Sequence, residues 1–193
     1  MLGDDIYNEI VRDVIDSYWR DYEDHEASFM PAFLANDILR IWRTFCVNYE
    51  ARTKRVPDDK KASGKLHNYK LKHSRLLTCY SALLYLLAIY STKETVSPTD
   101  AIRMTKLTPI ERLEELMGDT HFSAAKIAIT RLLSQYERFL ETTNCGKDDL
   151  ISQFQDKDTS RMYMAAANEF GDSMFEAISI IGDKNSFHRL LVV

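Results

Sequence analysis

Apolar residues recur three and four positions apart along much of the chain, the spacing at which side chains share one face of an α-helix. Over residues 4–22 this spacing gives a wide apolar stripe, which predicts a first helix that faces a core. Further helices are predicted over 31–52, 69–91, 123–142 and 159–181, and no segment alternates apolar and polar residues as a strand does. The stripe of the first helix consists of Ile6, Ile10, Val14 and Tyr18, with Tyr7, Val11, Ile15, Trp19 and Tyr22 beside them.

Two short segments carry the signals of helix starts. Ser97-Pro98-Thr99-Asp100 places a proline in a first turn, and Thr108-Pro109-Ile110-Glu111 has the Thr and Glu of a capping box, with Gly118 closing that helix. A short helix or tail is predicted over 185–193. We therefore predict an all-α fold, a single-domain bundle of five or six main helices over residues 1–193.

Composition agrees with an all-helical fold and indicates the cellular compartment of the protein. The chain has 193 residues, 45% hydrophobic and 28% charged, and its six Gly and four Pro are too few for a turn-rich β-sandwich. Its three cysteines are far apart in sequence, which is typical of free thiols in a reducing compartment. The most apolar run, 76–90, is shorter than the roughly 20 residues of a membrane span. We expect a soluble, cytoplasmic protein with no membrane partner.

Charge is distributed unevenly along the chain. The net charge is −4, yet residues 52–75 hold nine lysines or arginines against two aspartates, a local charge of +7. Residues 53–69 also contain a proline and a glycine, and we predict a basic loop there, between the second and third helices. A positive segment in an acidic protein favours phosphate-bearing ligands, although a solvated loop explains the same composition.

Familiar enzyme signatures are absent from the sequence. It has no Gly-rich phosphate loop, dinucleotide fingerprint, nucleophile elbow or paired-histidine metal helix, so we expect no metal site.

On the second predicted helix, Arg40, Arg43 and Glu50 lie opposite the apolar face. Arginines one turn apart suit either a bound anion or an exposed surface with ion pairs. Arg20 and His25 fit the R-x4-H motif of helical HEPN ribonucleases, in which the His acts in acid–base cleavage of RNA.

Two blocks of sequence resemble a known family. Residues 33–50 read FLANDILRIWRTFCVNYE and residues 68–75 read NYKLKHSR. They resemble the patterns FLLNDxxRYWRTxxVDYE and NIKLxxSRK of bacterial nucleotidyltransferase-like proteins. The chain differs at Asn48, where the family often has Asp, and it lacks the KPW-like stretch before Asn68.

The resemblance implies a role beside a catalytic domain. In that family an all-helical region follows a polymerase-β-like domain whose Gly-Ser motif and Asp-x-Asp pair hold metal and triphosphate. This sequence has neither motif, so the resemblance implies an accessory, substrate-binding domain that is not catalytic by itself. It implies no cofactor of its own, and a Mg²⁺–nucleotide only where a catalytic domain is supplied elsewhere.

The matched blocks supply the candidate site residues. We expect five of them to bind nucleotide or RNA phosphates and four to support these: Arg40, Arg43, Lys70, Ser74 and Arg75 as binding residues, and Asn36, Asp37, Glu50 and Asn68 as supporting residues. Two other functions stay open at this point. One is a helical interaction or regulatory module that docks to a protein partner or forms a homodimer, and the other is the HEPN-like ribonuclease.

Overall fold

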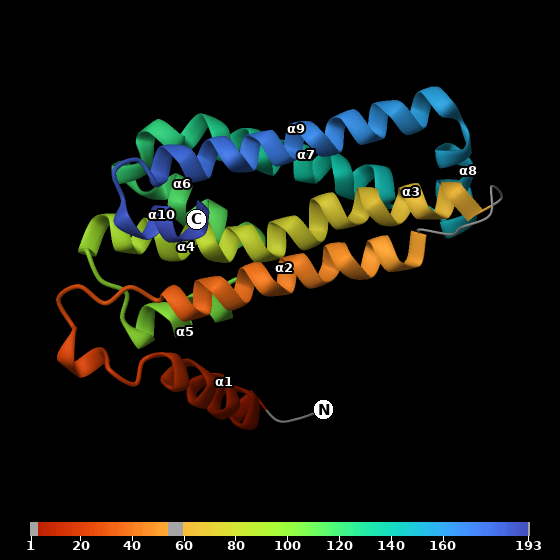
Figure 1. The fold of residues 1–193 in the computed structure, drawn as a ribbon. Coiled ribbons are helices and arrows are strands. Elements are labelled where there is room, and N and C mark those ends of the chain that lie inside the picture. The colour runs from red at the N-terminus through yellow and green to blue at the C-terminus, as the bar shows by residue number, and fades with distance from the viewer. Residues whose placement is uncertain (1–3, 54–59, 193) are drawn as a thin grey trace.

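The protein is all-helical (Figure 1). The computed structural model describes residues 4–53 and 60–192. Its α-helices are α1 (Asp4–Tyr18), α2 (Ala32–Thr53), α3 (Lys61–Lys70), α4 (Leu76–Lys93), α5 (Pro98–Lys106), α6 (Pro109–Gly118), α7 (Lys126–Thr143), α8 (Lys147–Gln155), α9 (Lys157–Ile181) and α10 (Ser186–Val192). The described residues contain no strand, which confirms the all-α class, and they contain more helices than the five or six predicted.

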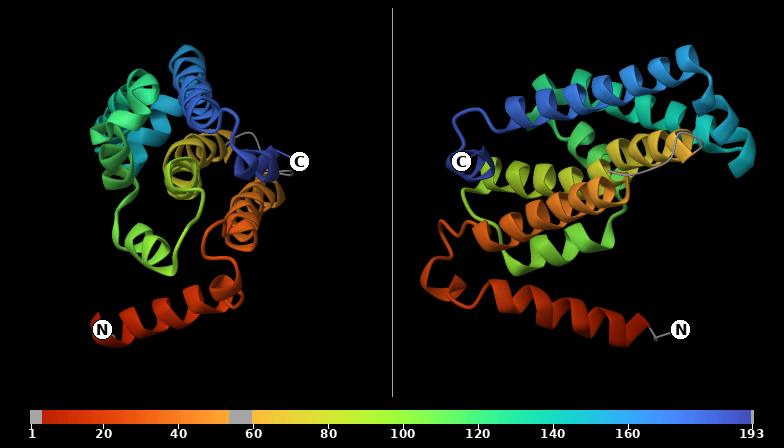
Figure 2. Two further views of the ribbon diagram at one scale, coloured as in Figure 1. Left: turned by 90° about the vertical axis from the view of Figure 1, so that its left-hand side faces the viewer. Right: turned by 45° about the vertical axis from the view of Figure 1, so that its right-hand side comes forward.

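One long helix forms the centre of the bundle. It runs without a break from Lys61 to Lys93 as α3, the π-helical turn η3 (Leu71–Arg75) and α4. Helix α2 lies along one side of it, and α7 and α9 lie along the other (Figures 1 and 2). Within the described ranges it is the one helix with the length and apolar content of a membrane span. The most apolar window of that helix is 56% buried inside the bundle, as in the core helix of a soluble protein.

The predicted basic loop over 53–69 is wrong over its second half. Residues 54–59 lie outside the described residues, and α3 begins at Lys61. Its glycine and lysines weaken the helical signal, but Ala62, Leu66 and Tyr69 are buried on one face against α8. Packing of that apolar face supplies the stability that local propensity does not.

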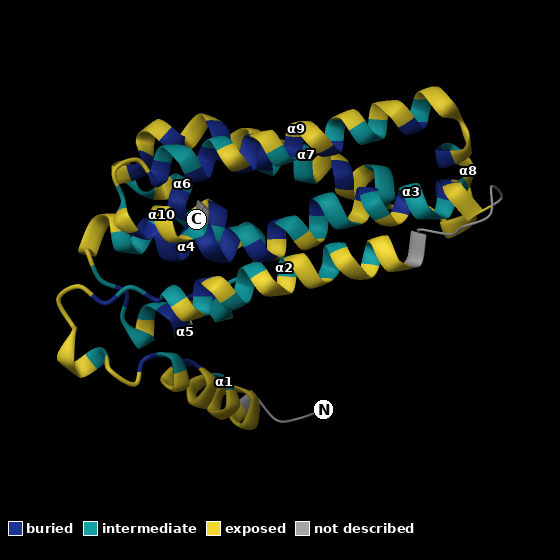
Figure 3. Ribbon diagram, in the orientation of Figure 1, coloured by how far each residue is buried: buried dark blue, intermediate teal, exposed yellow. Residues whose placement is uncertain are grey.

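The core consists of a main apolar cluster and a smaller aromatic one. The main cluster is built around the leucines of α4, together with residues of α5, α6, α7 and α9. The smaller cluster gathers Leu66, Tyr69, Phe139 and Phe154 at the end of the bundle where α8 lies. Figure 3 shows the buried positions along the central helix and the exposed ones along α1.

Helix α1 is the exception to the predicted burial of apolar stripes. Ile6, Ile10 and Val14 are each close to half exposed, while Ile15 and Trp19 are buried. In both views of Figure 2 the helix stands apart from the bundle and approaches it near α5. The expectation that the stripe faces a core is therefore wrong for these three residues, because α1 packs on the bundle near α5 through the other part of the stripe, which includes Ile15 and Trp19.

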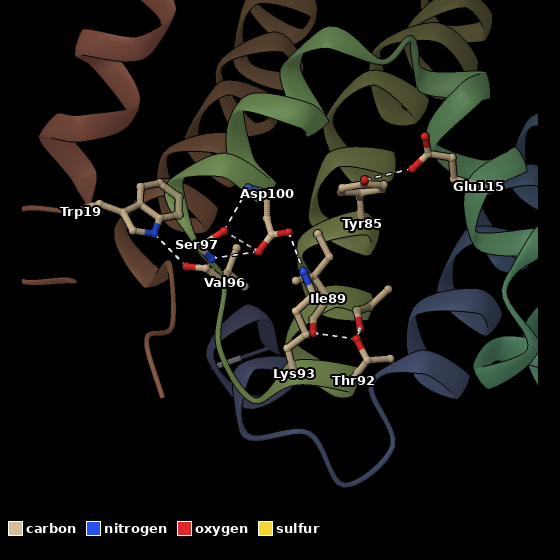
Figure 4. Close-up of polar contacts among 10 residues, drawn as sticks. Trp19, Tyr85, Ile89, Thr92, Lys93, Val96, Ser97, Asp100 and Glu115 are labelled. Atoms are coloured by element: carbon tan, nitrogen blue, oxygen red, sulfur yellow. Dashed lines mark hydrogen bonds and ion pairs between the residues drawn. The ribbon is translucent and has the colours of Figure 1, made fainter. Parts of the chain in front are cut away.

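Hydrogen bonds at the start of α5 hold the N-terminal segment in place (Figure 4). The indole Nε1–H of Trp19 donates to the carbonyl oxygen of Val96, 2.8 Å away. At the next residue Ser97 and Asp100 form a capping box, and Lys93 Nζ lies 2.8 Å from Oδ1 of Asp100. The predicted helix starts at Ser97 and Thr108 are both confirmed, since Thr108 forms a capping box at the start of α6.

Candidate functional site

A cleft of about 560 Å³ lies between α2 and the central helix. We call it the α2–α3 cleft. Its lining comprises Phe45, Asn48 and Tyr49 of α2 and His67, Lys70, Leu71, Ser74 and Arg75 of the central helix. Three polar residues of the second matched block, Lys70, Ser74 and Arg75, meet α2 in this cleft.

The spacing of residues on the central helix explains why they share the cleft. His67, Lys70 and Ser74 are three and four positions apart, so their side chains follow one face. The helix changes to π geometry over Leu71–Arg75, within this face. Single π turns inside α-helices are rare and are frequent at functional sites. The local backbone therefore marks the same stretch that carries the cationic side chains.

Two cations of the cleft are available to a ligand. Lys70 and Arg75 are both exposed, and neither forms an ion pair with any residue that the structure describes. The guanidinium carbon of Arg75 lies 5.0 Å from the centroid of the Phe45 ring. This cation–π contact holds the arginine against the wall of the cleft without neutralising its charge.

Uncharged donors stand beside these cations. The Ser74 hydroxyl and the Asn48 amide line the cleft and make no side-chain hydrogen bond within the described ranges. Tyr49 adds a half-buried ring. Positive charge, neutral donors and aromatic rings in one cleft are the groups that bind phosphate and stack a planar base.

Of the five predicted phosphate-binding residues, three line the cleft and two do not. Lys70, Ser74 and Arg75 are brought together there. Arg40 instead donates from Nη1 to Oδ1 of Asp37 at 2.9 Å. The other oxygen of that carboxylate accepts a hydrogen bond from the Tyr18 hydroxyl, also at 2.9 Å. The pair therefore ties α2 to the end of α1, away from the cleft.

The remaining predicted residues also lie outside the lining of the cleft. Arg43, Asn36 and Glu50 are exposed on α2. Asn68 is directed to the opposite side of the central helix, where its Nδ2 lies 3.9 Å from Sδ of Met164 on α9.

The two residues of the HEPN-like motif lie in the connector between α1 and α2. Arg20 and His25 are both exposed there, outside any α-helix. Neither residue lines the α2–α3 cleft.

Sequence reasoning missed five residues of the cleft: Phe45, Asn48, Tyr49, His67 and the apolar Leu71. Phe45 and Tyr49 fall on the apolar face of α2, and Asn48 stands out in the sequence only as a difference from the family pattern. His67 lies in the stretch predicted as loop, although its spacing of three from Lys70 and seven from Ser74 is a helical signal.

The described residues hold no group of three or more His, Cys, Asp or Glu side chains that could bind a metal ion together. Comparison with protein-family models, with curated proteins and with solved structures found no match. The likeness to nucleotidyltransferase-like proteins accordingly stays a prediction.

Proposed function

We propose that the chain is a nucleotide-binding helical module that serves a nucleotidyltransferase catalytic domain as its accessory, substrate-binding part. The observation that carries the proposal is the convergence of Lys70, Ser74 and Arg75 on the α2–α3 cleft. Lys70 and Arg75 contact the phosphates, and the Ser74 hydroxyl donates one further hydrogen bond. The base lies against the Tyr49 ring.

The size and charge of the cleft favour a nucleotide. Its volume of about 560 Å³ falls within the roughly 300–1,000 Å³ of small-molecule sites. None of its described lining residues is an aspartate or glutamate, so the phosphates meet no like charge. The proposal assigns binding to this chain, and any Mg²⁺ chemistry to the catalytic domain.

Calorimetric titration of the purified chain with ATP and with adenosine tests this function. We expect ATP to bind more tightly than adenosine, with an affinity that falls as salt is added. Lys70→Ala and Arg75→Ala should each weaken ATP binding by about tenfold, since a hydrogen bond to a charged group contributes roughly 1.5–3 kcal/mol. Adenosine binding should change little in either variant.

Arg12→Ala is the matched control, because Arg12 is an exposed arginine on α1. It should leave ATP binding unchanged. ATP affinity that is undetectable, or equal in the wild type and both cleft variants, contradicts the proposal. A short single-stranded RNA that binds more tightly than ATP, and depends on the same two residues, would identify RNA as the ligand.

A second function is favoured by α1, whose apolar row is exposed. Ile6, Ile10 and Val14 would be covered in a complex with a protein partner or a second copy of the chain. Sedimentation velocity over a range of concentrations tests for self-association. If the chain forms a dimer that Ile10→Lys disrupts, the docking module becomes the better description.

A further inference from the structure

A second and larger cavity lies on the other side of the central helix. It lies between α7 and α9, is open to solvent along its rim, and has a volume of about 740 Å³. We call it the α7–α9 cavity. Its lining includes the rings of Tyr69, Phe139 and Tyr163, and its polar lining residues include His73, Gln135 and Arg138. None of these residues takes part in the α2–α3 cleft.

His73 presents one free acceptor to this cavity. The side chain is only 1% exposed. Its Nδ1 lies 2.9 Å from the carbonyl oxygen of Tyr69, and a carbonyl can only accept, so Nδ1 carries the proton. In the neutral ring Nε2 then holds a lone pair, and Nε2 has no hydrogen-bond partner within the described part of the chain. Burial lowers the pKa of His73 to about 4, which keeps the ring neutral at pH 7.

The imidazole is fixed in its orientation by aromatic neighbours. Its ring stacks on Phe139, with centroids 4.5 Å apart and planes 8° apart. On Phe170 the separation is 4.9 Å and the angle 27°. Tyr69 contacts it edge-on at 4.5 Å. A ring held in this way cannot turn to exchange its two nitrogens, so the unpartnered acceptor keeps its place.

Gln135 adds a second unmet acceptor in the lining of the cavity. Its Oε1 is buried and has no donor within hydrogen-bond distance in the described residues. Buried polar atoms without a partner are uncommon in native proteins, and a bound ligand is one way to satisfy them. The buried Gln135 Oε1 and the unpartnered Nε2 of His73, both among aromatic rings, favour a ligand that carries a hydrogen-bond donor.

The rim of the cavity has a small excess of positive charge, since two cations that form no ion pair within the described part of the chain, Lys126 and Arg138, face one such acid, Glu169. Arg131 pairs with Glu176 on α9, with Nη1 and Oε2 2.7 Å apart. Arg138 is exposed and forms no ion pair in the described ranges. Lys126 and Glu169 also line the cavity and carry opposite charges. This balance suits a ligand with a single negative charge better than a phosphate ester.

We propose that the α7–α9 cavity binds a hydroxylated aromatic carboxylate. The aromatic body lies among Tyr69, Phe139 and Tyr163, its hydroxyl donates to Nε2 of His73, and its carboxylate accepts from Arg138. This site is separate from the nucleotide site, and it gives the module a small-molecule ligand besides its substrate.

Three matched probes test the chemistry of recognition: 6-hydroxy-2-naphthoate, 6-methoxy-2-naphthoate and 2-naphthol. The second lacks the donor and the third lacks the charge. In calorimetric titrations of the wild-type chain we expect the methoxy compound to bind about tenfold more weakly than the hydroxy acid, because it cannot donate a hydrogen bond to Nε2 of His73. We expect 2-naphthol to bind about fivefold more weakly, and this difference should shrink in high salt.

Two variants assign these preferences to residues. His73→Phe keeps an aromatic ring between Phe139 and Phe170 and removes Nε2, so the hydroxy and methoxy acids should bind it within about twofold of each other. Arg138→Gln should make the hydroxy acid and 2-naphthol bind alike. Arg12→Gln, on α1, is the control and should keep both preferences.

Several outcomes would overturn the proposal: no binding of any probe at millimolar concentration, equal binding of the hydroxy and methoxy acids by the wild type, or a preference that survives His73→Phe.

If His73→Phe does not fold, the ¹⁵N NMR signal of Nε2 in the wild type is measured in place of that variant. That signal should shift on addition of the hydroxy acid and not of the methoxy acid, and an unchanged signal overturns the proposal. ATP should not compete with the probe, which keeps this result independent of the nucleotide site.

Discussion

Two neighbouring residues of the central helix, Tyr69 and Lys70, show how differently its two sides are used. Tyr69 is 3% exposed and contacts the rings of His73, Phe139, Phe154 and Tyr163. Lys70 is exposed in the α2–α3 cleft. One turn later the buried His73 and the cleft residue Ser74 repeat the contrast.

The contrast shows that position on the helix, more than residue type, decides the chemistry of each site. In the open cleft, water screens the charges of Lys70 and Arg75, so both can stay charged without partners. In the cavity, burial makes an imidazole neutral and an unpaired oxygen unfavourable. Each proposed site therefore suits a different class of ligand, phosphates in the cleft and a hydroxylated aromatic carboxylate in the cavity.

The largest effect that this contrast predicts is in stability. Tyr69→Ala removes a ring from the smaller aromatic cluster and should lower the free energy of unfolding by about 4 kcal/mol. Lys70→Ala changes an exposed side chain and should alter it by no more than about 0.5 kcal/mol. Urea unfolding of both variants beside the wild type measures the difference. Similar losses in the two variants would mean that Lys70 also packs into the core.

The next effect is a pH dependence that belongs to the cavity side. The folded pKa of His73 is lowered from 6.5 to about 4, first by burial and then by the nearby charge of Lys72. Between these values the unfolded chain binds more protons, so the free energy of unfolding falls as the pH is lowered from about 6.5 to about 4. The full contribution is about 3 kcal/mol, because each tenfold change in proton affinity corresponds to about 1.4 kcal/mol.

Thermal unfolding of the wild type and of His73→Phe from pH 7 to pH 4 checks this pH dependence. The variant has no group that must stay neutral at this position, so its stability should fall less over that range. Arg138 and Glu169 line the same cavity in both proteins, and subtracting the two curves removes their contribution. Parallel curves would show that folding does not lower the pKa of His73.

The sequence predicted the fold class better than it predicted burial and element boundaries. Capping residues and apolar spacing are local signals, and they located the starts of α5 and α6. Helix α8 was missed because a glycine such as Gly146 is typical of the end of the preceding helix, whereas α7 ends at Thr143 and Gly146 is the N-cap of a helix that buries Leu150 and Phe154. The burial of α1 was wrong because its apolar stripe is wider than the surface that α5 offers.

The candidate sites were predictable only in part. Lys70, Ser74 and Arg75 were found because they are close in sequence and basic or polar. His73 drew no attention because its meaning depends on Phe139 and Phe170, which are far away in sequence. The sequence suggested that Arg40 binds a ligand, because it lies on a polar face. The structure instead shows Arg40 paired with Asp37, whose carboxylate also accepts a hydrogen bond from Tyr18 at the end of α1. Residue type can be read from a sequence, while the partner that completes a site comes from the fold.

The smallest predicted effect is also the most specific to the cavity. Gln135→Leu removes a buried oxygen that has no donor in the described residues, and the new side chain is similar in size and forms helices well. Because an unsatisfied buried polar atom is unfavourable, this variant should be more stable than the wild type by about 1 kcal/mol. Asn48→Leu, in the solvated α2–α3 cleft, is the matched control and should change stability by less than about 0.5 kcal/mol. Chemical denaturation of the three proteins without ligand provides the measurement.

A gain in Gln135→Leu alone would mean that the free protein keeps an unfavourable polar group in the cavity, as a site preserved for binding does. A loss would mean that Gln135 is already satisfied by water, and the cavity would then hold one unmet acceptor, His73, instead of two.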